Sequence, residues 1–127
     1  MFNFLKNLNQ ANEPLVEKIA GEAITKGEVL DYNASGKLVK ATTAAKFVAM
    51  KDAVADEKIN VAPIRNEDVY ETEVVSGITE GTAYDLDANS TGLATTTTNK
   101  IFLAEKVGEE KITGRFIRPV VVEKVSE

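Results

Sequence analysis

The side chains best suited to chemistry in this chain are the oxygen donors of a loop that begins at Asp31. Asp31, Asn33 and Ser35 alternate along the loop and are followed by Gly36, as the first ligands and the glycine do in an EF-hand. The twelfth position, where an EF-hand needs a bidentate Glu, is Thr42. A second loop offers Asp85, Asp87 and Asn89 as possible ligands. It also lacks the bidentate Glu, because the twelfth position is Thr96, and its glycine comes late, at Gly92. We therefore predict two hairpin loops in which Asp and Asn bond to nearby backbone amides, and no metal site.

Other catalytic chemistries have little support in the sequence. The chain has no His and no Cys, so it lacks the commonest general base, a thiolate nucleophile and most transition-metal ligands. It contains no G-x-S-x-G, P-loop or G-x-G-x-x-G motif. We predict a protein that is not an enzyme and needs no cofactor. The alternative is an enzyme with a pair of inward-facing carboxylates, because the chain has 20 acidic residues, although these stand in charged runs typical of solvated surfaces.

Composition indicates one globular domain. The 127 residues are 43% hydrophobic and 28% charged. The net charge of -5, without a cluster of Lys or Arg, argues against binding to nucleic acid. No apolar run approaches the roughly 18 residues that span a membrane. The first ten residues also lack the apolar core and cleavage site of a signal peptide.

Matches recur along the chain at a nearly constant spacing. Ile24-Thr25 matches Ile78-Thr79 at an offset of 54 (78 − 24 = 54). The Glu-Lys-Ile at Glu57 matches that at Glu110 at an offset of 53 (110 − 57 = 53). Further matches are Gly27 with Gly81, Asp31 with Asp85, Ala34 with Ala88 and, if the second loop is two residues longer, Gly36 with Gly92. We interpret residues 15–66 and 69–120 as two copies of one unit. Since a solenoid needs about three repeats or more, we expect one pseudo-symmetric domain over residues 15–127.

Each unit has the pattern of short strands joined by polar turns. Runs such as "GEVLDYN", "KFVAM", "KIFLA" and "KINVAPI" are of strand length and rich in β-branched or aromatic residues. Four glycines are predicted at structural turns, namely Gly27, Gly36, Gly81 and Gly92. We therefore predict an all-β fold, a small β-barrel or β-sandwich of eight to ten strands. The clearest helical possibility is one or two turns before Pro14.

The first 14 residues lie outside the repeat and form an expected N-terminal arm. They combine Asn and Gln with four large apolar side chains, Phe2, Phe4, Leu5 and Leu8. Two interpretations stay open. The arm covers one end of its own domain, or it is an extended peptide whose apolar side chains anchor it to a partner.

The turn-and-strand pattern of the first unit resembles the small capsid decoration proteins of tailed bacteriophages, also called cement or head-stabilising proteins. The resemblance lies in "ITKGEV" at 24–29, "GKLVKA" at 36–41 and "FVAMKDA" at 47–53. The second unit departs from the pattern, with Ala83 in place of a valine and "TTTT" at 95–98.

This resemblance implies a structural virion protein on the outer surface of the assembled capsid. Its partner would be the major capsid protein, whose neighbouring subunits it would hold together, and copies of the chain would sit on the shell as monomers or as trimers. The four apolar residues of the arm are the predicted capsid contacts: Phe2, Phe4, Leu5 and Leu8. The alternative function is another virion interaction module, such as a head-fibre base or a tail component. A carbohydrate-binding module is disfavoured because the chain has no Trp and only three Tyr.

Overall fold

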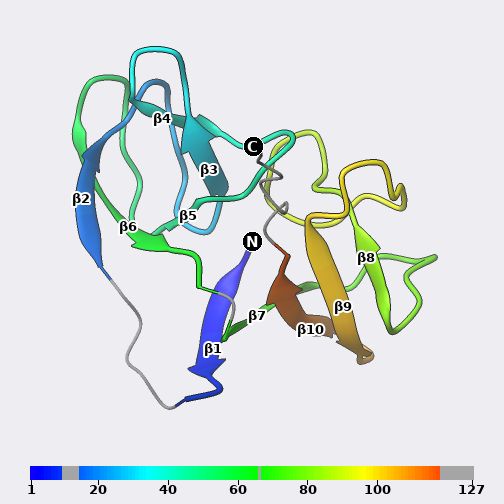
Figure 1. Ribbon diagram of the computed structural model, residues 1–127. Helices are drawn as coiled ribbons and strands as arrows, with labels where there is room; N and C mark the ends of the chain where they lie inside the picture. The colour runs from blue at the N-terminus through cyan, green and yellow to red at the C-terminus, as the bar shows by residue number, and fades with distance from the viewer. Residues whose placement is uncertain (10–14, 66, 118–127) are drawn as a thin grey trace, which may run out of the picture.

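The computed structural model describes residues 1–9, 15–65 and 67–117, and in these ranges it contains ten β-strands and no helix (Figure 1). The all-β prediction is therefore confirmed. The helical turn considered before Pro14 is wrong for its first half, because Asn3–Asn7 forms a strand. The strands are β1 Asn3–Asn7, β2 Val16–Ile19, β3 Val29–Tyr32, β4 Leu38–Lys40, β5 Phe47–Ala49, β6 Lys58–Pro63, β7 Asp68–Glu73, β8 Thr82–Tyr84, β9 Phe102–Val107 and β10 Lys111–Phe116.

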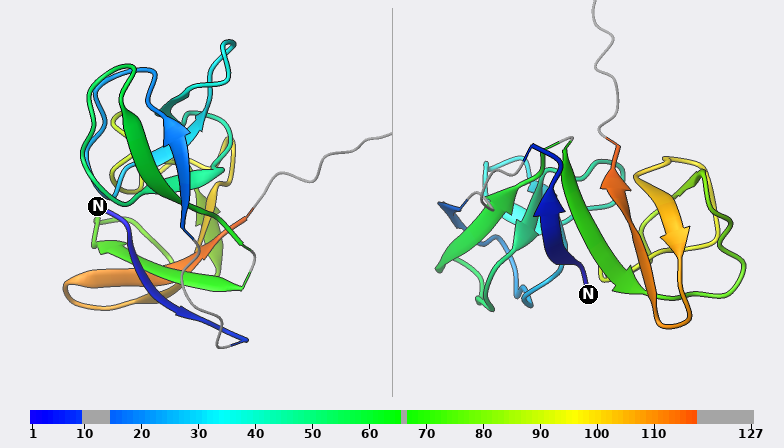
Figure 2. Two further views of the ribbon diagram at one scale, coloured as in Figure 1. Left: turned by 90° about the vertical axis from the view of Figure 1, so that its left-hand side faces the viewer. Right: turned by 90° about the horizontal axis from the view of Figure 1, so that it is seen from below.

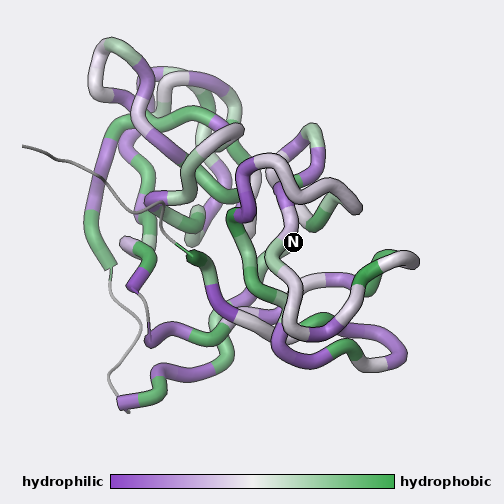
Figure 3. The backbone as a smooth tube through the Cα atoms, turned by 45° about the vertical axis from the view of Figure 1, so that its right-hand side comes forward, coloured by the Kyte–Doolittle hydropathy of each residue, from purple (hydrophilic) through white to green (hydrophobic). Residues whose placement is uncertain are grey.

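The strands form two five-stranded sheets whose paired strands are all antiparallel. One sheet has the order β1-β7-β10-β9-β8 and the other β2-β6-β5-β3-β4. Neither sheet closes on itself, so the arrangement is sandwich-like and not a barrel (Figures 1 and 2). Figure 3 shows the hydropathy of each residue along the backbone. Buried residues alternate with less buried ones along β10, as expected where one sheet face is buried, whereas all three residues of β5 are buried.

The strand registers of the two sheets agree at the spacing found in the sequence. β2 pairs with β6 through Val16↔Val61, and β7 pairs with β10 through Tyr70↔Gly114. These pairs are 54 and 53 positions apart (70 − 16 = 54; 114 − 61 = 53). Leu30↔Phe47 between β3 and β5 and Tyr84↔Phe102 between β8 and β9 are 54 and 55 positions apart (84 − 30 = 54; 102 − 47 = 55).

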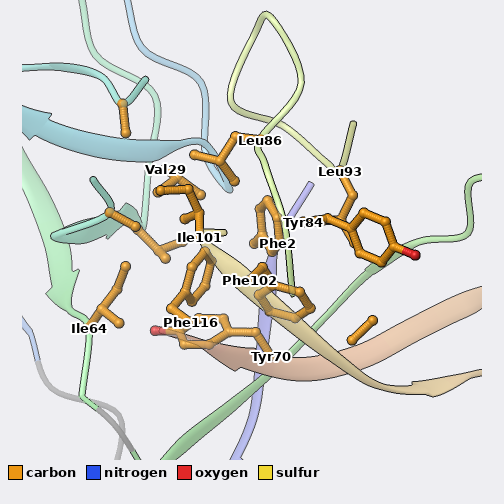
Figure 4. Close-up of a cluster of buried hydrophobic side chains, with 14 of the residues drawn as sticks. Phe2, Val29, Ile64, Tyr70, Tyr84, Leu86, Leu93, Ile101, Phe102 and Phe116 are labelled. Carbon is orange, nitrogen blue, oxygen red and sulfur yellow. The ribbon is translucent and has the colours of Figure 1, made fainter. Parts of the chain in front are cut away.

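The buried side chains form two clusters. One lies within the half that contains the β2-β6-β5-β3-β4 sheet and includes Ile24, Leu30, Leu38 and Ile59. The other joins the two halves, since Val29, Val48 and Ile64 of the first half pack with residues of the second. Figure 4 shows the aromatic centre of this joint core, formed by Phe2, Tyr70, Phe102 and Phe116.

As far as the structure describes it, the predicted N-terminal arm takes part in the β1-β7-β10-β9-β8 sheet. β1 pairs with β7, and the Phe2 ring lies in the joint core. Three parts of the predicted organisation lie outside the described residues. They are residues 10–14 of the arm, position 66 at the end of the first predicted repeat, and residues 118–127.

Three of the four predicted turn glycines have the left-handed backbone that disfavours other residues. The φ angles are 90° at Gly27, 78° at Gly36 and 85° at Gly81. Gly92 is not among the glycines with positive φ, so its pairing with Gly36 requires correction. In that loop the positive φ occurs at Ser90, at 59°. Its N–H donates to Asp87 O at 3.1 Å, and Gly36 N–H donates to Asn33 O at the same distance.

Candidate interaction surface

Two edge strands that follow one another in the chain carry much of the exposed apolar surface. β1 ends one sheet and β2 ends the other. Directly after β2, Ala20 makes an isolated bridge with Leu38 of β4, and Gly21 N–H donates to Leu38 O at 2.7 Å. Large apolar side chains are exposed on or beside both strands: Leu5, Leu8, Leu15, Val16 and Ile19. The left view of Figure 2 shows both strands on the side that faces the viewer. We call these five residues the edge-strand surface.

β1 is held in position by aromatic packing at its start. The Phe2 side chain is 1% exposed, and its ring lies 5.0 Å from that of Phe116 and 5.4 Å from that of Phe102, measured between centroids. Its N–H donates to Gly27 O at 3.0 Å, which ties the start of β1 to the first half of the molecule. Phe4 packs edge-on against Tyr70 at 5.7 Å.

A buried polar cluster holds the other end of β1. Asp68, which is fully buried, accepts a hydrogen bond from Asn7 Nδ2 at 2.9 Å. Its carboxylate also accepts from the Arg65 guanidinium, at 2.8 Å from Nη2 and 2.9 Å from Nε. The hydrogen bond to Asp68 raises the pKa of Arg65 above its usual value. Because a buried carboxylate is costly unless it is paired, this cluster fixes β1 beside the segment that joins the two sheets.

The two loops that offered metal-like ligands are organised by backbone hydrogen bonds. Asn33 Oδ1 accepts from the N–H groups of Ser35 at 2.8 Å and Lys37 at 3.0 Å. Asp87 Oδ1 accepts from those of Asn89 at 3.1 Å and Thr91 at 3.0 Å. These are the Asx-type turns that the sequence predicted. No group of three or more Asp or Glu side chains in the described ranges is arranged to hold a metal ion.

The second of these loops also joins the two halves. Ser90 is 1% exposed, and its Oγ–H donates to Ala41 O at 2.5 Å. Its own carbonyl accepts from Val29 N–H at 2.9 Å. Sequence analysis missed this role, because a single serine in a polar loop gives no sign of a distant partner.

Asp85 orders the segment that follows the same loop. Its carboxylate accepts hydrogen bonds from Thr96 Oγ1 at 2.5 Å and from the N–H groups of Thr98, Asn99 and Lys100 at 3.0, 2.6 and 2.9 Å. Burial opposes ionisation of this group, but the four hydrogen bonds outweigh it and lower the pKa of Asp85. The carboxylate therefore serves the loop as an anionic acceptor.

The other acceptors of the two tight turns also have structural partners. Glu28 Oε1 accepts from Thr25 N–H at 2.9 Å, and the Tyr84 hydroxyl accepts from Thr79 N–H at 2.9 Å. The second bond is the main reason that the pKa of Tyr84 is lowered. The two turns thus use different side chains, a carboxylate and a phenol, to accept a hydrogen bond from a backbone N–H.

The structure separates the four predicted capsid-contact residues into two kinds. Phe2 is buried and Phe4 is half-buried against the core, so they anchor β1 within the protein itself. Leu5 and Leu8 are 46% and 53% exposed and are available to a partner. Val16 and Ile19 were not among the predicted contacts, because they were assigned to the repeat and not to the arm.

A small pocket lies beside the start of β1, with a volume of about 160 Å³. Phe2, Phe4, Val48 and Met50 are among its lining residues. Pockets for drug-sized ligands usually measure roughly 300–1,000 Å³, so this one suits at most a very small molecule.

The described part of the chain contains no helix that could cross a membrane.

Comparison with known proteins provides no further assignment. No family model matches the chain, and the curated proteins contain no significant match to it.

Proposed function

We propose that this protein is a non-enzymatic decoration protein that binds the outer surface of an assembled bacteriophage capsid and stabilises contacts between major capsid protein subunits. The observation that supports the proposal beyond the sequence resemblance is the difference in burial along the first eight residues. The Phe2 side chain, directly before β1, is buried in the core, whereas the side chains of Leu5 and Leu8 are exposed. A rigid strand that presents apolar side chains loses little conformational freedom when it binds, which favours docking on a preformed surface.

The proposal includes a repeated structural unit, with residues 15–66 and 69–120 as two pseudo-symmetric copies. The equal strand registers of the two sheets support this reading. A chain with two related halves has two similar surfaces with which to contact neighbouring capsid subunits. Two weak contacts made at once give much higher avidity than either contact alone. A protein that binds the shell and not the free subunits stabilises the shell by mass action.

The test is co-sedimentation of the purified chain with intact heads of its phage and, separately, with unassembled capsid protein. The double variant Leu5→Glu, Leu8→Glu places one charge on β1 and a second directly after it, both at exposed positions. Val54→Glu is the matched control, because Val54 is 58% exposed and lies in a turn far from β1 in the chain.

We expect the native chain and the Val54→Glu control to sediment with heads at a fixed copy number, and the double variant to stay in the supernatant. Failure of the native chain to bind heads would overturn the proposal. Binding of the double variant at the native level would show that a capsid contact lies elsewhere on the molecule.

The second candidate is another virion interaction module, a head-fibre base or a tail component. The same exposed side of β1 would serve such a role. Binding to isolated tails, with none to heads, would favour it.

A further inference from the structure

Gly92 is a glycine whose backbone conformation does not require one. It lies in the long loop between β8 and β9 (Figure 1), it is buried, and it is not among the residues with positive φ. A Cβ placed at this position would have two heavy atoms of the described, non-adjacent residues within 4 Å, and both are side-chain oxygens. Asp87 Oδ2 would lie at 3.3 Å and Thr72 Oγ1 at 3.7 Å. The absence of a side chain therefore leaves a small space that two polar atoms border.

The Thr72 hydroxyl is buried and has no hydrogen-bond partner within the part of the chain that the structure describes. The residue is 0% exposed and lies in β7, where it faces Ile112 of β10. Nearly all buried hydroxyls in proteins are bonded to another protein group or to an ordered water, because an unsatisfied one is costly. A small polar molecule beside Gly92 would supply the bond that Thr72 lacks.

Asp87 can accept one hydrogen bond more than the structure gives it. Its Oδ1 accepts from the N–H groups of Asn89 and Thr91, and its Oδ2 accepts from Thr91 Oγ1 at 3.0 Å. Each carboxylate oxygen has about two acceptor sites, so Oδ2 has one left. The space thus offers a hydroxyl that can donate and a carboxylate oxygen that can accept. A water molecule suits both, since it accepts and donates at once.

We propose that one ordered water is bound beside Gly92, where it accepts a hydrogen bond from Thr72 Oγ1 and donates one to Asp87 Oδ2. Buried waters typically have two to four polar partners of this kind. At about 2.8 Å per hydrogen bond, one water joins oxygens up to about 5.6 Å apart. The two distances to the Cβ position limit the separation here to 7.0 Å (3.3 + 3.7 = 7.0). The water also explains the glycine, because a methyl group at position 92 would take its place.

This water links β7 to the loop that joins the two halves of the molecule. Asp87 O accepts from Ser90 N–H at 3.1 Å. Ser90 in turn accepts from Val29 N–H and donates to Ala41 O, both in the first half. The position of Ser90 therefore depends on Asp87, and the position of Asp87 depends on the Thr72 hydroxyl through the water.

The first experiment is urea unfolding of the isolated full chain, whose result is independent of the proposed capsid role. Thr72→Val removes the hydroxyl and keeps the shape of the side chain. We expect it to lower the urea midpoint, because the water and Asp87 lose a hydrogen bond. Thr72→Ser keeps the hydroxyl and is the matched control, with a smaller loss. An unchanged or raised midpoint in Thr72→Val would overturn the proposal, since the removal of a hydroxyl without any partner stabilises a protein.

Gly92→Ala reverses the sign of this effect. The added methyl group displaces the water and leaves the Thr72 hydroxyl without a partner. In the Gly92→Ala background, Thr72→Val should therefore raise the midpoint, whereas the same downward shift in both backgrounds would contradict a shared water.

A crystal structure of the native chain, at a resolution that shows ordered waters, provides the direct readout. We expect one water within hydrogen-bonding distance of both Thr72 Oγ1 and Asp87 Oδ2, and none there in Gly92→Ala. A direct hydrogen bond between the two side chains, a peak with the short coordination distances of a metal ion, or no water between them would overturn the proposal.

Discussion

Replacing Phe2 with alanine should destabilise the whole domain, although Phe2 is the second residue of the sequence. Its side chain is 1% exposed and packs against the rings of Phe102 and Phe116. Truncation of a buried Phe to Ala typically costs about 3–5 kcal/mol, through lost burial and the cavity that remains. With an unfolding entropy of roughly 2.1 cal/mol/K per residue, a loss of about 4 kcal/mol in a chain of 127 residues lowers Tm by roughly 15 °C.

The assay is urea unfolding of the isolated protein followed by circular dichroism, because the chain has no Trp for fluorescence. The matched control is Leu5→Ala in the same strand, where the side chain is 46% exposed and the expected cost is about 0.5 kcal/mol or less. If Phe2→Ala changes the free energy of unfolding by less than about 1 kcal/mol, β1 is not part of the core and the argument for its rigidity fails.

Three further predictions concern the loops and the closest backbone contact. Gly114→Ala should cost roughly 3 kcal/mol or more of folding stability, because its Cβ would lie 1.9 Å from Leu103 O. Gly36→Ala should cost only about 1–2 kcal/mol through backbone strain, since nothing lies within 4 Å of its Cβ. Urea unfolding of the two variants compares these losses. Ser90→Ala should cost about 1–3 kcal/mol by leaving Ala41 O without its donor, and amide hydrogen exchange at Val29 should then speed up. The folded pKa of Asp85 is lowered, so the stabilisation by its carboxylate is present above the unfolded pKa near 4 and is lost as the pH falls through the folded pKa. Asp85→Asn should therefore be less stable than the native chain at pH 7, and its free energy of unfolding should depend less on pH below pH 4. An unchanged pH dependence of the free energy of unfolding would contradict this role.

The sequence by itself determined the class of the fold and its local turns. Short runs of β-branched and aromatic residues between polar turns predicted an all-β chain, because period-two patterns and turn residues are local properties. Gly27, Gly36 and Gly81 could be assigned to turns for the same reason, since the demand for a positive φ arises within a few residues. The side-chain to backbone bonds of Asn33 and Asp87 are likewise local.

Only the tertiary structure decided where β1 lies and which of its side chains remain exposed. Phe2, Phe4, Leu5 and Leu8 look alike as apolar residues near the start of the chain, but Phe2 is buried by rings 100 and 114 positions away, Phe102 and Phe116 (102 − 2 = 100; 116 − 2 = 114). The role of Ser90 was also not visible in sequence, because the groups that hold it, Val29 N–H and Ala41 O, lie in the other half of the chain. Such choices depend on packing and hydrogen bonds between distant segments, which local propensity does not encode.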